Sequence, residues 1–166
     1  MQRTHYNTNF NKRTFPVTLV CDGVANAPNI GSLFRIADAF GVEKLIFCGQ
    51  QIVLGRKITK TSRATEKVVD YEICESALNV VQRLKDEGVQ IISLEITDTS
   101  TSISSFKFTS KDPLALIIGD ENFGVSETIL KLSDAIVHIE MFGQNSSMNV
   151  VQAANIALYE ITKHLL

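Results

Sequence analysis

Short apolar runs alternate along the chain with segments whose apolar residues recur every three or four positions. The runs at 15–21 and 114–118 are rich in Val, Leu and Ile, and each stops at a glycine-containing turn, as buried strands do. The helical spacing is clearest in the last segment, 147–165. Strands that alternate with helices form mostly parallel sheets with helices on both faces. The pattern therefore predicts an α/β fold built on such a sheet.

The same pattern predicts where each strand and helix begins and ends. Strands are predicted at 15–21, 43–48, 89–95, 114–118 and 135–139, with a further short strand beginning at 68–69. Helices are predicted at 30–40, 74–87, 126–132 and 147–165. Because Pro28 disfavours helical geometry in the residue before it, the first helix is expected to start after Asn29, its N-cap. The stretches 50–65 and 97–105 are predicted to be loops.

Length and composition are those of a one-domain globular protein. The chain has 166 residues, 45% of them hydrophobic, so one domain is expected over 16–166, after a flexible arm at 1–15. No apolar run is long enough to cross a bilayer, and the start lacks a signal-peptide core. Three widely spaced cysteines, Cys21, Cys48 and Cys74, argue against a disulfide framework or zinc site. These features favour a reducing, cytoplasmic setting.

The charged residues are unevenly distributed. The formal net charge of −2 argues against a protein coated with nucleic-acid-binding charge. Two stretches, 1–21 and 50–65, nevertheless contain basic residues and no acidic ones. These basic residues are Arg3, Lys12 and Arg13 in the first stretch and Arg56, Lys57, Lys60 and Arg63 in the second. Such stretches suit contacts with phosphates at a few points, although ordinary solvated loops have the same composition.

Motifs for nucleotide cofactors and metals do not match. The loop after the first strand lacks the G-x-G-x-x-G of dinucleotide-binding folds. Gly119 and Gly124 have the glycine spacing of a P-loop, but Val125 stands where that loop requires Lys. No Ser-His-Asp arrangement or metal-ligand spacing is visible, and no metal is expected. His138 alternates with apolar residues, so it is interpreted as a packed structural histidine.

Polar residues at the ends of elements, or beside small residues on a helix, are the remaining candidates for chemistry. They are Asn29, Arg35, Glu121, Ser147 and Asn149. Each also has a purely structural explanation. Asn29 and Ser147 suit helix N-caps, Arg35 suits a helix surface, and Glu121 suits a turn with free amides. Asn149 suits an ordinary polar position in the first turn of a helix.

Three blocks, taken in order, resemble the SpoU family of the SPOUT class of RNA methyltransferases. The first is Asn29 to Gly41, the second Gly119 to Gly124, and the third Ile139 to Val150. Their order and spacing match over almost the whole chain past residue 16. The chain departs from the family pattern at Glu140, where Pro is common, and at Met148, where Leu is usual.

The resemblance implies a knotted fold and a cofactor, neither of which follows from the spacing of the apolar residues. Family members thread a C-terminal trefoil knot, and S-adenosyl-L-methionine binds there through the backbone of three loops. The positions that match its binding residues are Leu94, Glu95, Ile96, Gly119, Glu121, Gly124, Ile139, Met141, Gly143, Ser147 and Met148.

The resemblance also implies the reaction, which is methylation of a ribose 2′-hydroxyl in RNA. Arg35 matches the catalytic arginine, acting either as a base or by positioning phosphate and hydroxyl. A guanidinium is a poor base, so positioning is favoured. Asn29 would orient Arg35 or the ribose, and Glu121 would organise the second loop. Ser147 and Asn149 would fix the third loop.

The expected partners are RNA and a second copy of the chain. Family members dimerise through the first and last helices. Contacts with RNA are predicted at Arg13, Arg56, Lys57, Lys60 and Arg63, with tRNA favoured over rRNA because no added RNA-binding domain is visible. The alternatives are a knotted RNA-binding protein without methyltransferase activity and a dinucleotide-dependent enzyme.

Overall fold

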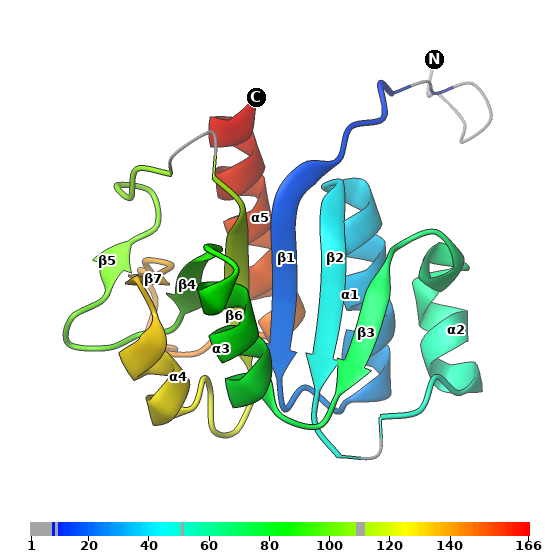
Figure 1. Ribbon diagram of the computed structural model, residues 1–166, viewed down its shortest axis with the longest axis horizontal. Helices are drawn as coiled ribbons and strands as arrows, with labels where there is room; N and C mark the ends of the chain where they lie inside the picture. The colour runs from blue at the N-terminus through cyan, green and yellow to red at the C-terminus, as the bar shows by residue number, and fades with distance from the viewer. Residues whose placement is uncertain (1–7, 9, 51, 109–111) are drawn as a thin grey trace.

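The computed structural model describes residues 8, 10–50, 52–108 and 112–166. Over these residues the chain forms a seven-stranded sheet of order β3-β2-β1-β6-β4-β7-β5, and every neighbouring pair of strands is parallel (Figure 1). The strands are β1 (Phe15–Asp22), β2 (Val42–Cys48), β3 (Tyr71–Cys74), β4 (Gln90–Leu94), β5 (Thr101–Ser102), β6 (Leu114–Gly119) and β7 (Ala135–His138). The helices are α1 (Ala27–Ala39), α2 (Arg56–Ser62), the 3-10 turn η2 (Thr65–Lys67), α3 (Ala77–Asp86), α4 (Glu127–Leu132) and α5 (Val150–Leu165). The predicted α/β class with a mostly parallel sheet is confirmed.

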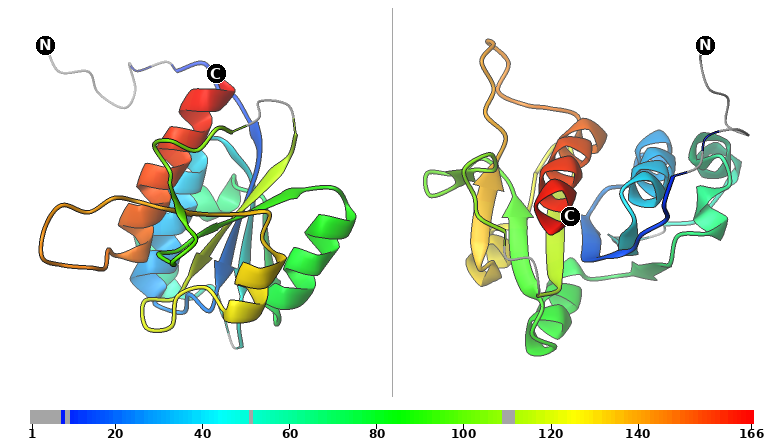
Figure 2. Two further views of the ribbon diagram at one scale, coloured as in Figure 1. Left: turned by 90° about the vertical axis from the view of Figure 1, so that its left-hand side faces the viewer. Right: turned by 90° about the horizontal axis from the view of Figure 1, so that it is seen from above.

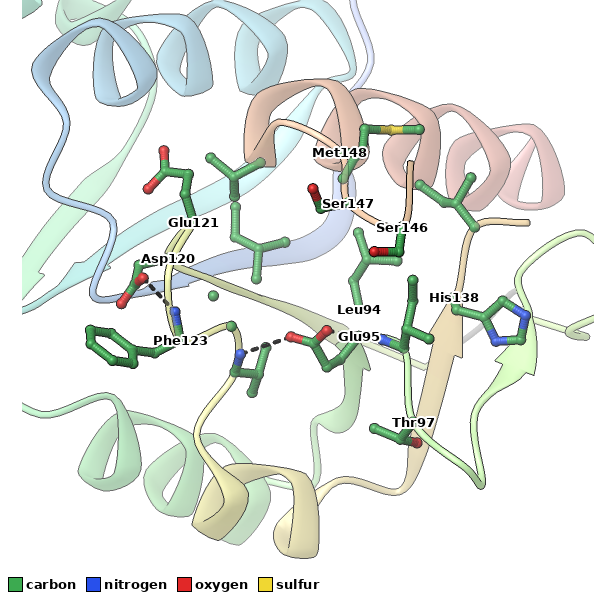
Figure 3. A pocket seen from close by; sticks show the side chains of 18 of the residues that line it. Leu94, Glu95, Thr97, Asp120, Glu121, Phe123, His138, Ser146, Ser147 and Met148 are labelled. Atoms are coloured by element: carbon green, nitrogen blue, oxygen red, sulfur yellow. Dashed lines mark hydrogen bonds between the residues drawn. The ribbon is translucent and has the colours of Figure 1, made fainter. Parts of the chain in front are cut away.

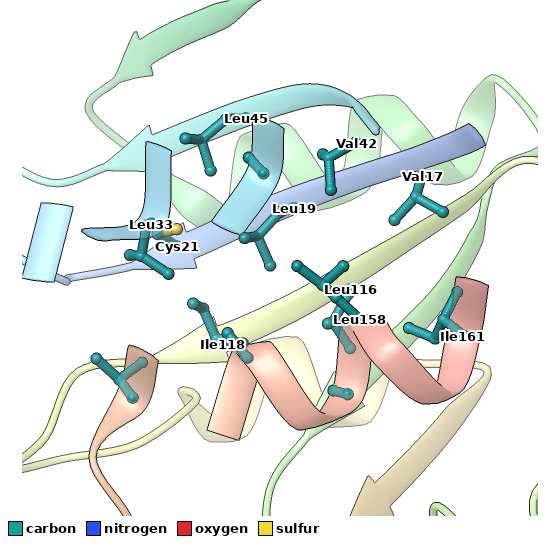
Figure 4. Close-up of a cluster of buried hydrophobic side chains, with 14 of the residues drawn as sticks. Val17, Leu19, Cys21, Leu33, Val42, Leu45, Leu116, Ile118, Leu158 and Ile161 are labelled. Atoms are coloured by element: carbon teal, nitrogen blue, oxygen red, sulfur yellow. The ribbon is translucent and has the colours of Figure 1, made fainter. Parts of the chain in front are cut away.

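Helices cover both faces of the sheet. Helices α1 and α5 lie against one face and α3 and α4 against the other, as Figure 2 shows. The alternation within β6 explains why. Leu116 and Ile118 pack towards α1 and α5 (Figure 4), whereas Ile117 packs towards α3. A strand buried on both faces is apolar at nearly every position. Burial of each of these side chains stabilises the folded state by about 1.5–3 kcal/mol relative to leaving it exposed.

Helix α1 begins earlier than predicted. Its N-cap is Asn26, whose side-chain oxygen accepts a hydrogen bond from the backbone N–H of Asn29 at 3.2 Å. Pro28 lies in the first turn, where a helix needs no N–H donor and where a fixed φ is favourable. The prediction that Asn29 is the N-cap was therefore wrong, and the Asn29 side chain is available for another contact.

Four other elements differ from the prediction. Residues 56–62 form α2 instead of a loop, although only Ile58 and Ser62 of this helix are buried. The short strand expected at 68–69 begins instead at Tyr71, and the helix after it begins at Ala77. The Ser/Thr-rich segment contains β5, a two-residue strand that pairs with β7.

The arm predicted at residues 1–15 lies only partly within the residues that the structure describes. Residues 1–7 and 9, which include Arg3 and His5, lie outside them. Arg13 is described: its Nη2 donates to the carbonyl of Leu165 at 3.0 Å, and its guanidinium lies over the Phe15 ring. Arg13 thus contacts the last turn of α5.

The cysteines pack in and beside the core. Cys21 and Cys48 are buried, Cys74 is half-buried, and all three are free thiols. Burial raises the pKa of the Cys48 thiol to about 12. Among the described residues, no helix is both long and apolar enough to cross a membrane, and no group of His, Cys, Asp and Glu has the arrangement of a metal site.

Candidate functional site

A cavity of about 510 Å³ opens where β4, β6 and β7 end (Figure 3). These three strands are neighbours in the sheet and run in the same direction, so the loops after them meet at one edge. The wall is formed by residues 94–97, 118–125, 138, 139, 141 and 146–148, with Leu130, Val150 and Ala153. Crevices at the carboxyl ends of parallel strands are the usual place for ligands in α/β folds.

The loop after β6 is a tight turn. The Asp120 side chain accepts hydrogen bonds from the N–H groups of Asn122 at 2.6 Å and Phe123 at 2.9 Å. The N–H of Gly124 donates to the Asp120 carbonyl at 3.0 Å, and Gly124 has a φ of +63°. A Cβ on Gly119 would lie 2.0 Å from the carbonyl carbon of Gly124. The turn therefore requires glycine at both of its ends.

Glu95 connects the first two loops. One carboxylate oxygen accepts from the N–H of Val125 at 3.0 Å, and the other accepts from its neighbour Ile96 at 3.0 Å. Figure 3 shows this carboxylate at the wall of the cavity. A Cβ on Gly124 would lie 2.2 Å from the same carboxylate, so the turn approaches Glu95 as closely as a glycine allows.

Three polar side chains from distant parts of the chain meet beside the cavity. The side-chain amide of Asn29 on α1 donates to the Glu121 carboxylate in the second loop. The side-chain amide of Asn149 in turn donates to the Asn29 oxygen at 3.4 Å. These pairs are separated by 92 and 120 residues in the chain. The fold thus joins three of the five predicted catalytic residues in one cluster.

Asn149 also begins α5. Its side-chain oxygen accepts from the N–H groups of Val151 at 2.9 Å and Gln152 at 3.4 Å. The helix was predicted to start near Ser147, but Asn149 is the N-cap. The third loop is therefore longer than expected, and the cap residue itself belongs to the cluster.

The sequence model of the SpoU rRNA Methylase family matches residues 16–159. The chain belongs to this family. The resemblance inferred from the three sequence blocks is thereby confirmed.

Individual SpoU-family relatives are moderately similar. The chain is 28% identical over 144 residues to a "Putative TrmH family tRNA/rRNA methyltransferase" of Staphylococcus saprophyticus, covering 86% of this chain and 57% of that protein. It is 30% identical over 152 residues to the tRNA (guanosine(18)-2′-O)-methyltransferase of Aquifex aeolicus, covering 90% of this chain and 70% of that protein. The solved structure of the SpoU methyltransferase AviRb of Streptomyces viridochromogenes with AdoMet matches with a TM-score of 0.79 and 26% identity, over 92% of this chain and 61% of that one. The chain thus spans little more than half of the first of these proteins.

Ten of the eleven residues predicted to bind the cofactor line the cavity. They are Leu94, Glu95, Ile96, Gly119, Glu121, Gly124, Ile139, Met141, Ser147 and Met148. The eleventh, Gly143, is not a lining residue; it is exposed, and a Cβ there would meet nothing within 4 Å. The third loop thus turns away from the cavity between Met141 and Ser146.

Arg35 lies apart from the cluster. It is exposed on α1 and is not among the cavity-lining residues. Six residues after Asn29, it lies about 9 Å further along the helix. It shares a side of α1 with Gly31, which is four residues earlier. Helix α2 packs there so closely that a Cβ on Gly31 would lie 2.6 Å from the Ile58 carbonyl.

The basic residues of the second stretch lie on α2. Arg56, Lys57, Lys60 and Arg63 are all exposed, at or just after the helix that contacts α1. The cavity has the opposite character, because Glu95, Asp120 and Glu121 line it. Among the described residues, no lysine or arginine lines it. The acidic wall of the cavity and the basic surface of α2 are therefore separate regions.

Sequence reasoning missed some residues at the site. Asp120 organises the second loop, and the pattern Asp-x-x-Phe-Gly contains a signal for it, since Asp commonly accepts from amides two residues on. His138 lines the cavity although it was interpreted only as a packed residue; its Nδ1 lies 2.9 Å from the Ser100 hydroxyl. That contact depends on β5, which has no clear sequence signal.

Proposed function

We propose that this SpoU-family chain transfers a methyl group from S-adenosyl-L-methionine to a ribose 2′-hydroxyl in a structured RNA. The observation that carries the proposal is the cluster of Asn29, Glu121 and Asn149 beside the cavity. Similar proteins are named for this chemistry, including the Aquifex aeolicus tRNA (guanosine(18)-2′-O)-methyltransferase.

The cavity fits the proposed cofactor in size and charge. Carboxylates line it without a lysine or arginine among the described residues, which suits a positively charged sulfonium. The glycines at 119 and 124 allow the turn to fold closely on itself and on Glu95, so the wall of the cavity is formed in advance. When bound, the cofactor supplies a methyl group that is already activated. The residues that would hold it are the ten that line the cavity, and Gly143 would act only through the shape of the third loop.

The side chains around the cavity would hold and orient the acceptor. Arg35 would bind the phosphate beside the target ribose and position the hydroxyl; a bidentate guanidinium suits that task better than proton removal. Asn29 and Glu121 would hold each other and the ribose edge in place. Asn149 and Ser147 would fix the third loop, where the Ser147 N–H donates to the Asn145 side chain at 3.3 Å.

The proposed site is completed by a second copy of the chain. Arg35 does not reach the cavity of its own chain, so a neighbouring copy would supply this residue across an interface of α1 and α5. These two helices contact each other, and α5 exposes Ile156 and Tyr159. Family membership further supports a C-terminal trefoil knot formed by the chain around the third loop. Light scattering of the purified protein should give the mass of a dimer.

The basic residues of α2 would bind RNA phosphates. Arg56, Lys57, Lys60 and Arg63 are exposed on the side of α1 that also carries Arg35, and Arg13 would add a contact near the end of α5. We favour tRNA over rRNA, a preference that the name of the Aquifex aeolicus relative supports. We also favour a cytoplasmic location. A knotted RNA-binding protein without methyl transfer is the second candidate, and the exposed basic helix is the observation that favours it.

The test is methyl transfer to total tRNA and total rRNA from labelled S-adenosyl-L-methionine, followed by mapping of the labelled nucleotide. Arg35→Ala should abolish transfer while the cofactor dissociation constant, measured by calorimetry, stays unchanged. Arg83→Ala is the matched control, because Arg83 is a partly exposed arginine on α3, on the other face of the sheet. Transfer by Arg35→Ala near the unmodified rate would contradict the proposed role, and no cofactor binding at millimolar concentration would favour the second candidate.

A further inference from the structure

The turn between β6 and α4 presents one large apolar side chain to solvent. Phe123 is 87% exposed, yet it contributes to the rim of the cavity. Figure 3 shows its ring on the outer side of the turn, directed away from Glu95. Single exposed apolar residues are ordinary on protein surfaces. What distinguishes Phe123 is the place where the chain holds it.

The backbone under Phe123 is held by several hydrogen bonds. Its own N–H and that of Asn122 donate to the Asp120 side chain. The next residue, Gly124, donates to the Asp120 carbonyl and forms an isolated bridge with it. The backbone from which the ring projects is therefore held in place. Binding of a planar group there would cost little backbone conformational entropy.

Phe123 is close to the proposed reaction centre. It follows Glu121 by two residues, which limits the backbone separation to about 7 Å. Glu121 in turn contacts Asn29, the first member of the cluster beside the cavity. A nucleotide whose ribose lies at this cluster has its base within reach of the Phe123 ring.

The charges around the ring favour a base over a phosphate. Asp120 and Glu121 belong to the same turn, and the Asp22 carboxylate accepts from the N–H of Ser126 just beyond it. Three carboxylates repel a phosphate, whereas an uncharged base is not repelled. The exposed cluster of basic residues lies elsewhere, on α2. Proteins that bind single-stranded nucleic acids combine these two features, stacking aromatics and a separate basic track for the backbone.

We propose that Phe123 stacks on the base of the methyl-accepting nucleotide, which must therefore be unpaired and turned out of its stack. The assignment of this base to the acceptor nucleotide rests on the proposed function. Stacking on an aromatic ring tolerates any base, because every base has a π-face. Phe123 would accordingly select for an accessible loop nucleotide and not for its identity.

The experiment compares the binding of short single-stranded RNA of random sequence with that of a duplex RNA of equal length, both fluorescein-labelled, by fluorescence anisotropy. Phe123→Leu keeps an apolar side chain but removes the ring, and Phe123→Trp keeps a ring. We expect Phe123→Leu to weaken single-strand binding by about fivefold or more, the lower end of the effect of one stacked base. Phe123→Trp should retain it, and duplex binding should not change in either variant.

The matched control is Phe142→Leu, since Phe142 is 94% exposed in the third loop but does not line the cavity. Three results would each overturn the proposal. The first is that Phe123→Leu and Phe123→Trp weaken single-strand binding equally. The second is that duplex binding weakens as much as single-strand binding. The third is a change of oligomeric state in Phe123→Leu, which would mean that a second copy covers the ring. Binding requires no methyl transfer, so absence of enzymatic activity would contradict the proposed function without altering this result.

Discussion

The cavity and helix α2 are two regions of opposite construction. Around the cavity, the turn of residues 119–124 is held by backbone and carboxylate hydrogen bonds and by two glycines in close contact. Around α2, a short helix buries only Ile58 and Ser62 and exposes its basic residues. The first region is acidic and closely constrained, and the second is basic and largely exposed.

The difference follows from what each region is proposed to bind. A cofactor of fixed shape needs a preformed wall, because a displacement of even an ångström weakens its contacts. A phosphate backbone is attracted at longer range and without directional demands. Separating the two charges also keeps the phosphates away from carboxylates that would repel them. Substitutions in the first region should therefore act through geometry, and those in the second through charge alone.

The largest effect is expected from Gly119→Ala. The new Cβ would lie 2.0 Å from the Gly124 carbonyl carbon and 2.3 Å from the Val125 nitrogen. Both are backbone atoms, so the turn itself would have to shift. We expect loss of cofactor binding by calorimetry, and a decrease in the free energy of unfolding of about 2–4 kcal/mol. Gly55→Ala, at the start of α2, is the control, since nothing lies within 4 Å of its Cβ position. Wild-type cofactor affinity in Gly119→Ala would contradict the constrained turn.

Removal of charge from α2 should have the next largest effect. In Lys57→Gln/Lys60→Gln we expect RNA binding to weaken about tenfold at moderate salt. The slope of log affinity against log salt should decrease in magnitude by about 1.4–1.8 as two phosphate contacts are lost. Cofactor affinity should not change. Lys131→Gln on α4, an exposed lysine paired with Glu127, is the control. An unchanged salt slope would remove α2 from the RNA-binding surface.

The two regions also differed in how far their structure could be predicted. The strands that lead to the cavity are visible because apolar residues fill both faces of β4 and β6, and that pattern is typical of buried parallel strands. The roles of Asn29, Glu121 and Asn149 came from the resemblance, since each residue alone suits a cap, a turn or a polar position in the first turn of a helix. No local pattern shows that these three side chains touch across 92 and 120 residues.

The α2 region escaped prediction for a physical reason. A seven-residue helix with two buried positions has too little apolar periodicity to be detected, and Gly55 at its N-cap forms no side-chain capping bond. Its position depends on Gly31 in another helix, where the absence of a Cβ permits close packing. Similarly, β5 exists only through its pairing with β7. Tertiary contacts, which are not visible as a local pattern, determine these elements.

A smaller effect is expected from substitutions of Asn149. They can separate its role as the N-cap of α5 from its hydrogen bond to Asn29. Asn149→Ala should lower the free energy of unfolding by about 1 kcal/mol, because the N–H groups of Val151 and Gln152 lose their acceptor. Asn149→Ser should retain the cap and most of the stability but lose the contact with Asn29, so methyl transfer should fall in both variants. Asn155→Ala, on an exposed turn of α5, is the control and should not destabilise the helix. Full transfer by Asn149→Ser would show that only the cap matters.

The smallest effect concerns Glu72 on β3, at the far edge of the sheet from the cavity. Lys44, with a nitrogen 2.5 Å away, and Arg83, at 2.9 Å, lower the pKa of this carboxyl from 4.5 to about 2. A lowered pKa means that the ionised form stabilises the folded state above pH 4.5, and that this contribution disappears as the pH falls from 4.5 to 2. Because the side chain is 31% exposed, the contribution at neutral pH should be only about 0.2–1 kcal/mol.

Chemical unfolding of Glu72→Gln should therefore show a small loss of stability at pH 7 that shrinks as the pH is lowered through 4.5 towards 2. Glu43→Gln is the control, because Glu43 is an exposed carboxylate on the adjacent strand β2 and forms no ion pair among the described residues. RNA and cofactor binding should be unchanged in Glu72→Gln at pH 7. A loss of stability that stayed constant down to pH 3 would mean that Glu72 acts through packing, and that its ion pairs do not stabilise this edge of the sheet.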